Sequence, residues 1–149
     1  MQLTTHFTLE EFIFSDTAAR HGLDNTPPEA LIPNIIETAH LVEEVRLKFG
    51  SPVLITSGYR SPAVNALVSG SSQTSAHTRG EAADCKSPGF GTPYTCCLAI
   101  RNAGIIFDQL ILEYDSWFHI SRVKNGTNRQ QILTKREGTN YMQGLVKKQ

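Results

Sequence analysis

The sequence predicts an α+β fold in which helices pack on one side of a small antiparallel sheet. One observation is an apolar residue every three or four positions between Leu31 and Phe49, which is the period of an amphipathic helix. Another is a set of short β-forming runs that turn-forming residues separate. The 149 residues contain no internal repeat. We expect a single domain over residues 1–149, with a polar, frayed end from about residue 135.

The N-terminal third is predicted to form two helices joined by a loop. Residues 8–11 (Thr-Leu-Glu-Glu) match a capping box, so a short helix is expected to begin there. Residues 15–28 contain several turn formers and are expected to form a loop. The long helix is then expected to begin with Thr26 as its cap and Pro27 in its first turn, and to end at Gly50.

The remainder of the chain is predicted to supply the sheet. Pro93 is expected to begin a helix that ends at Gly104, and residues 69–75, which are rich in serine, are expected to form a loop. Residues 114–116 are expected to form a tight hairpin turn. The β-forming runs that are expected to become strands are 53–56, 81–85, 105–113, 117–121 and 130–134.

Composition excludes several classes of partner. Fourteen Lys and Arg residues balance fourteen Asp and Glu residues, so there is no surplus of cations for binding nucleic acid. No apolar run is long enough to span a bilayer, so no membrane partner is expected. Residues 1–6 lack the pattern of a signal peptide, and we expect synthesis in a cytoplasm. The odd number of cysteines, three with two adjacent, fits a reducing compartment and free thiols.

Three residues form a set of ligands that suits zinc. His77 and Asp84 are seven positions apart in the stretch that begins at Ser75, and His119 follows in a later β-forming run. Two imidazoles and one carboxylate leave the fourth position of a zinc ion open for water. The thiolate of Cys85 is a rival ligand. Neighbouring residues of an extended segment point to opposite faces, so with Asp84 toward the metal we expect Cys85 to be buried.

The pattern S-x-H-x-x-G-x-A-x-D at 75–84, with the later aromatic-x-H-x-S at 117–121 and Ser-Gly-Tyr-Arg at 57–60, resembles the M15 zinc peptidases over roughly residues 7–121. That family contains D-alanyl-D-alanine carboxypeptidases and the L-alanyl-D-glutamate endopeptidases of phage lysins, and residues 7–28 resemble the lead-in of its phage branch. The resemblance implies one zinc ion per chain and a role for Arg60 in contacts to the substrate or the transition state. Ser75 would either donate to the substrate or hold the histidine loop.

A peptidase of this kind also needs a carboxylate as general base. Several family members carry Asp or Glu three residues before the last zinc histidine, where this chain has Ser116, which cannot serve. The nearby carboxylates are Glu113 and Asp115. A two-residue turn would pair Glu113 with Phe118, on the wrong face, whereas a three-residue turn would pair it with Trp117, on the metal-facing side. We favour Glu113, because aspartate at a hairpin tip is a common turn former, and keep both candidates.

The resemblance implies a zinc-dependent peptidase that hydrolyses amide bonds in peptidoglycan stem peptides. It points to a phage lysin or virion-associated lysin, made in the bacterial cytoplasm and acting on the cell wall after release or together with other phage virion proteins. One alternative is a non-catalytic structural or cell-wall-binding module on the same zinc-stabilised fold, which Ser116 favours. Another is a hydrolase of a different amide, such as a D-amino-acid dipeptide. The carboxylates near His119 favour an enzyme.

Overall fold

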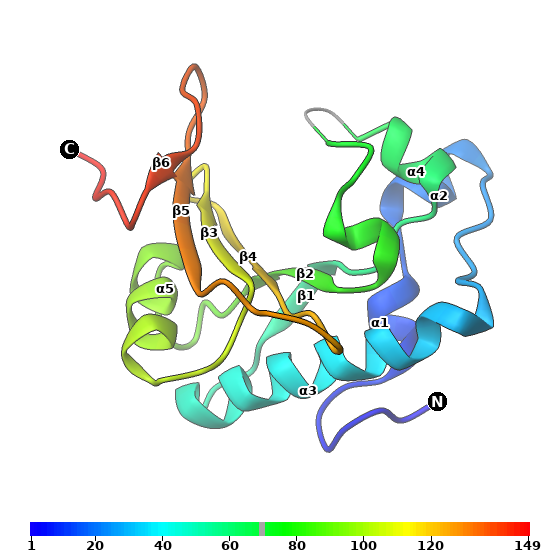
Figure 1. Cartoon of the computed structure of the whole chain (residues 1–149), viewed down its shortest axis with the longest axis horizontal. Coiled ribbons are helices and arrows are strands. Elements are labelled where there is room, and N and C mark those ends of the chain that lie inside the picture. Colours follow the sequence, from blue (N-terminus) through cyan, green and yellow to red (C-terminus); the bar gives the residue numbers. More distant parts are fainter. Residues whose placement is uncertain (69–70) are drawn as a thin grey trace.

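The computed structural model, which describes residues 1–68 and 71–149, confirms the α+β class (Figure 1). Residues 69 and 70 of the predicted serine-rich loop lie outside it. The helices are α1 Leu9–Ile13, α2 Asp16–His21, α3 Ile32–Phe49, α4 Pro62–Ala66 and α5 Pro93–Asn102, with 3-10 turns η1 Glu29–Leu31 and η2 Ala76–Arg79. The strands are β1 Leu54–Ser57, β2 Ala82–Lys86, β3 Gln109–Glu113, β4 Trp117–Ser121, β5 Gln131–Lys135 and β6 Met142–Gln143.

The six strands form one sheet in the order β1-β2-β4-β3-β5-β6. Every pair is antiparallel except β3 and β5, which run parallel, so the sheet is mostly antiparallel, as predicted, with one parallel pair. The cause is the path of the chain. Strand β4 ends beside the beginning of β3, and residues 122–130 then carry the chain to the free edge of β3, where β5 starts at the same end.

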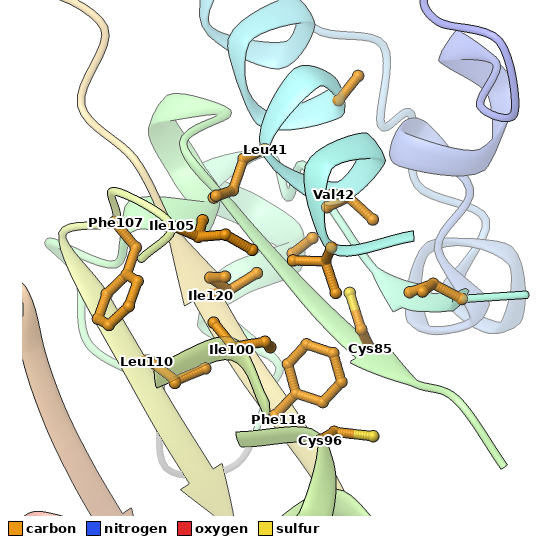
Figure 2. Close-up of a cluster of buried hydrophobic side chains, with 14 of the residues drawn as sticks. Leu41, Val42, Cys85, Cys96, Ile100, Ile105, Phe107, Leu110, Phe118 and Ile120 are labelled. Carbon is orange, nitrogen blue, oxygen red and sulfur yellow. The ribbon is translucent and has the colours of Figure 1, made fainter. Parts of the chain in front are cut away.

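The main core lies between the sheet and the helices α3 and α5. Figure 2 shows side chains from both helices meeting those of β2, β3 and β4. Along β4, Phe118 and Ile120 are fully buried in this cluster, and burial of each such side chain stabilises the fold by about 1.5–3 kcal/mol. Because side chains alternate along a strand, the other residues of β4 face the opposite side of the sheet. That side carries the candidate site.

The N-terminal helices differ from the prediction in two places. Residues 16–21 form a helix within the predicted loop, capped by Ser15, whose Oγ accepts from the Ala18 N–H at 3.1 Å. A serine caps its start and a glycine caps its end, as is common for helices. The helix is nevertheless too short for a periodic apolar pattern to reveal it in the sequence. The long helix begins at Ile32 instead of Pro27. Pro33 explains the delay, because a proline is tolerated in the first turn of a helix and clashes in its interior.

The other elements follow the prediction more closely. The capping box of α1 and the end of α3 at Gly50, which has a φ of 63°, are confirmed. The predicted strand 105–113 is shorter, because residues 105–108 form a loop, from which Ile105 and Phe107 still enter the core while Ile106 is exposed. The helix from Pro93 is confirmed, although it ends at Asn102, before Gly104. None of the helices within residues 1–68 and 71–149 is long and apolar enough to cross a membrane.

The chain packs against the sheet as far as Val146, contrary to the expectation of fraying from about residue 135. Strand β6 pairs with β5. The Thr134 hydroxyl donates to the Gly144 carbonyl at 2.8 Å and accepts from the Val146 N–H at 3.0 Å. A buried hydroxyl that both donates and accepts is fully satisfied. This segment therefore extends the sheet and, as described below, forms one wall of a cavity.

Thiol titration of the denatured, unreduced protein should count three free thiols. All three cysteines, Cys85, Cys96 and Cys97, are free and buried. Burial raises the pKa of each thiol, to about 11 for Cys96 and well above the ordinary value for Cys85 and Cys97. Because the thiolate is the reactive form, the native protein should react with the same reagent far more slowly than the denatured protein. A count of one would reveal a disulfide and contradict the expected reducing compartment.

Candidate metal centre and its cavity

The candidate metal centre lies on the face of the sheet that the helices leave free. In β4, His119 alternates with the buried residues Phe118 and Ile120 and therefore faces this side. Strand β2 lies beside β4 with Asp84 opposite His119, which brings the two side chains together across the sheet. His77 approaches from the 3-10 turn η2, directly before β2.

The three predicted ligands meet at one point. The Asp84 Oδ1 atom lies 3.2 Å from His77 Nε2 and 3.1 Å from His119 Nδ1, and one ligand atom from each residue lies within 4.8 Å of the others. Tetrahedral zinc with bonds of about 2.1 Å places neighbouring ligand atoms roughly 3.4 Å apart. The arrangement therefore has the size of a metal-binding triad, and these three residues could hold one ion.

The hydrogen bonds of His77 support a cation at this point. Its Nδ1 atom lies 2.7 Å from the Gly58 carbonyl oxygen, and a carbonyl oxygen can only accept, so Nδ1 carries the proton. Its Nε2 atom faces a carboxylate oxygen of Asp84 at 3.2 Å, so one proton can bridge these two atoms, and a metal ion can take the place of that proton because metal binding releases protons from its ligands. A metal ion between them would satisfy both, and a carbonyl that orients a ligating histidine in this way is a common support for metal sites.

Two glycines allow His77 this position. A Cβ atom at Gly58 would lie 2.4 Å from the Phe12 carbonyl oxygen, so the strand end that accepts from His77 can approach α1 only as glycine. Gly80 ends η2 with a φ of 73°, and a Cβ there would lie 2.8 Å from Ile35 Cγ1. At both positions a side chain would displace the backbone that carries or contacts the histidine.

Asp84 is held in its ionised form. Burial alone would raise its pKa, but the neighbouring His77 and the hydrogen bonds from both histidines outweigh burial and hold the pKa of Asp84 well below its usual range. Its side chain is 13% exposed, while His77 and His119 are 2% and 8% exposed. An ionised carboxylate between two nearly buried imidazoles is the protonation state that metal binding requires.

A cavity of about 1000 Å³ opens over the triad. Its lining includes the three triad residues and also Glu113, Arg60 and Ser75, all of them proposed from the sequence, whereas Asp115 is not part of it. The structure therefore brings six of the seven predicted site residues to one space. It also places Cys85 in the core on the opposite face of β2, so this thiol is no rival ligand.

Glu113 lies at the end of β3, directly opposite Trp117. This pairing confirms the three-residue turn, and Glu113 lines the same cavity as the triad. Burial, together with the negative charge of Asp84, raises its pKa to about 7, although His119, Arg60 and Lys135 partly oppose the shift. A carboxyl group with a pKa near 7 can both accept and donate a proton at neutral pH.

Asp115 occupies the tip of the same hairpin. Its two carboxylate oxygens accept from Arg136 Nε and Nη2 at 2.8 and 2.7 Å, and this bonding lowers its pKa. A bidentate pair of this kind fixes both side chains. Asp115 thus ties the hairpin to the C-terminal segment and is turned away from the cavity that Glu113 lines.

Arg60 follows β1 and lies beside the histidine turn, where its backbone N–H donates to the His77 carbonyl at 3.1 Å. Within the described residues its buried Nε has no hydrogen-bond partner. Burial lowers the pKa of Arg60, and the charges of Asp84 and Glu113 partly offset this. Ser75 Oγ accepts from the His77 N–H at 3.2 Å, so it holds the histidine turn and also lines the cavity.

Three further cavity residues were not among the predicted site residues. Trp117 is the aromatic residue of the 117–121 motif, and alternation places it on the face of His119, whereas Lys135 directly follows the predicted strand 130–134. Tyr141 lies in the segment that is expected to fray, and nothing in the sequence marks it. All three line the cavity, and the C-terminal segment thus contributes to a site whose motif ends at residue 121.

Comparison with known proteins agrees with this geometry. None of the curated proteins compared matches the chain significantly. The sequence model of the Peptidase M15 family matches residues 5–121, which include all three triad residues, Glu113 and Arg60. This match covers well over half of the sequence. Peptidases of this family are metallo-enzymes, and the chain has a triad of residues that could bind a metal ion. The chain belongs to the Peptidase M15 family of metallopeptidases.

Proposed function

We propose that the protein is a zinc-dependent peptidase that hydrolyses an amide bond in the stem peptides of peptidoglycan. The observation that carries this proposal is that a possible metal triad, a carboxyl group with a pKa of about 7 and an arginine that forms no ion pair among the described residues line one cavity. Membership of the Peptidase M15 family supports the reaction class. All strands that frame the cavity belong to one sheet, which supports treating residues 1–149 as one catalytic domain.

The triad His77, Asp84 and His119 would hold one zinc ion. When bound, zinc acidifies a water molecule and polarises an amide carbonyl. Glu113 accepts the proton of the attacking water and passes it to the leaving amine, which requires a pKa near the working pH. Glu113 and the triad line the same cavity, in which the scissile amide would bind.

Arg60 and Ser75 would position the substrate. The Arg60 guanidinium lines the cavity without an ion-pair partner among the described residues, so it can bind a substrate carboxylate or the oxyanion that develops during attack. Ser75 Oγ accepts from the His77 N–H, and its hydroxyl hydrogen remains available to donate to the substrate. The resemblance of residues 7–28 to the phage branch supports a finer proposal, a phage lysin or virion-associated lysin that acts on the cell wall after release or beside other virion proteins.

Purified protein should release peptides from bacterial sacculi, and a chelator should stop the release until zinc is restored. Mass spectrometry of the soluble products identifies the bond, because a carboxypeptidase releases a terminal amino acid and an endopeptidase releases a longer fragment. Sacculi from bacteria with different stem peptides serve as parallel substrates. If the zinc-loaded protein releases nothing from any of them, the non-catalytic cell-wall-binding module becomes the better explanation.

A further inference from the structure

One wall of the cavity is built by residues that lie beyond the family match. Strand β5 runs beside β3 with Lys135 in register with Glu113 and Leu133 in register with Ile111, and the family match ends at residue 121. Residues in register on neighbouring strands point to the same face. Lys135 therefore lies next to Glu113 on the cavity side, and both line the cavity.

Lys135 differs from two arginines that also line the cavity. Arg79 is paired with Glu81 at 2.7 Å and Arg129 with Asp108 at 2.7 Å. Within residues 1–68 and 71–149, the Lys135 ammonium forms no ion pair. It donates to the Thr139 carbonyl.

The position of the Lys135 ammonium is fixed by its contacts. Nζ lies 5.6 Å from the centre of the Tyr141 ring, a cation–π distance. The Thr139 carbonyl and the Tyr141 ring hold a full positive charge at the cavity wall without neutralising it. Its charge also acts on Glu113, whose pKa it lowers slightly against the effect of burial. The ammonium is therefore near the proposed catalytic carboxyl group, while Arg60 enters the same cavity from the opposite edge of the sheet, after β1.

We propose that Lys135, held by Tyr141, binds a carboxylate of the peptide substrate and so makes the enzyme selective for acidic peptides. This inference rests on the proposed peptidase function and adds a specificity residue to it. A substrate that lies across the triad reaches the C-terminal wall on the β5 side. A free carboxylate there meets a fixed, unpaired ammonium, whereas a neutral amide at the same place leaves that charge without a partner.

The test compares synthetic stem peptides that differ at one position, where each acidic side chain or free α-carboxylate is replaced in turn by its amide. For the wild type, kcat/KM should be about 10- to 100-fold higher for one acid than for its amide, the range of a charge-assisted hydrogen bond. Lys135→Gln retains a donor for the Thr139 carbonyl and removes the charge, so it should lose this preference by slowing the acid peptide. Lys135→Arg should keep the preference.

Calorimetric binding of the same peptides tests the inference independently of hydrolysis. Lys147→Gln is the matched control, because Lys147 is an exposed lysine of the same segment and should leave the preference intact. If binding favours one acid but no peptide is cleaved, the peptidase proposal fails and the carboxylate site stands. If the wild type treats every acid and amide pair alike, the inference is wrong. It is also wrong if Lys135→Gln slows both members of a pair equally and shifts the pH profile, because Lys135 then acts through Glu113.

Discussion

Asp84→Asn and His119→Gln should each remove the bound metal and reduce hydrolysis by on the order of 10³-fold or more. Asp84 contacts both histidines at 3.1–3.2 Å, so its substitution removes the carboxylate that lies between the two imidazoles. The rate falls steeply because a metal ion stabilises the transition state by several kcal/mol, and each 1.4 kcal/mol is a factor of ten. Elemental analysis of the wild type should find close to one zinc ion per chain, and both variants should bind far less.

His40→Gln is the matched control for these variants. His40 is an exposed histidine on α3, on the helix side of the sheet and outside the cavity lining, so its substitution should leave the zinc content and the rate unchanged. Circular dichroism distinguishes loss of the metal from loss of the fold. If the wild type binds no zinc even after zinc is supplied, the triad is a hydrogen-bonded cluster and the proposed peptidase mechanism is wrong.

The ligand triad could be predicted from the sequence because its geometry is mostly local. Asp84 and Cys85 are neighbours on one strand, and alternation alone assigns one to the metal side and the other to the core. In the structure, Asp84 lies with the two histidines in a group that could hold a metal ion, and Cys85 lies in the core. His119 lies on a strand whose apolar neighbours mark its buried face, so its direction also follows from the pattern.

The hairpin register could not be fixed in the same way. Two turn lengths were compatible with residues 113–117, and they place Glu113 on opposite faces of the sheet. In the structure, Tyr114 and Asp115 both have a φ of 55°, a left-handed conformation that glycine or asparagine usually signals. Tyrosine gives no such signal. The bidentate contact of Asp115 with Arg136 compensates for the strain, and it connects residues 21 positions apart.

The C-terminal wall was beyond sequence reasoning for a related reason. The run at 130–134 predicts a strand but not its neighbour, and the parallel pairing with β3 follows from the path of residues 122–130. Tyr141 lies in a polar stretch with no apolar period, where only tertiary contacts such as those of Thr134 create order. Local patterns thus predicted the metal side of the cavity, and long-range pairing determined its opposite side.

Glu113→Gln should retain the fold and the zinc ion and lower kcat by about 10²-fold or more, the usual contribution of a general base. Glutamine has nearly the same shape but cannot accept the proton of the attacking water. In the wild type the base must be ionised, so kcat/KM should rise with pH along an acid limb. That limb should lie at or below about pH 7, because burial raises the pKa of Glu113 to about 7 in the metal-free protein and a bound cation lowers the pKa of a nearby carboxyl group.

The same substitution should also alter stability once zinc is removed with a chelator. The pKa of Glu113 is raised on folding from 4.5 to about 7, so the folded state binds more protons in this range, and the free energy of unfolding should fall as pH rises from about 4.5 to 7. Glu113→Gln should flatten this fall of the free energy of unfolding with pH.

Asp115→Asn is the matched control, because Asp115 bonds to Arg136 at the tip of the same hairpin. This substitution should cost little activity and about 1 kcal/mol or less of stability. If Asp115→Asn abolishes activity while Glu113→Gln does not, Glu113 is not the base.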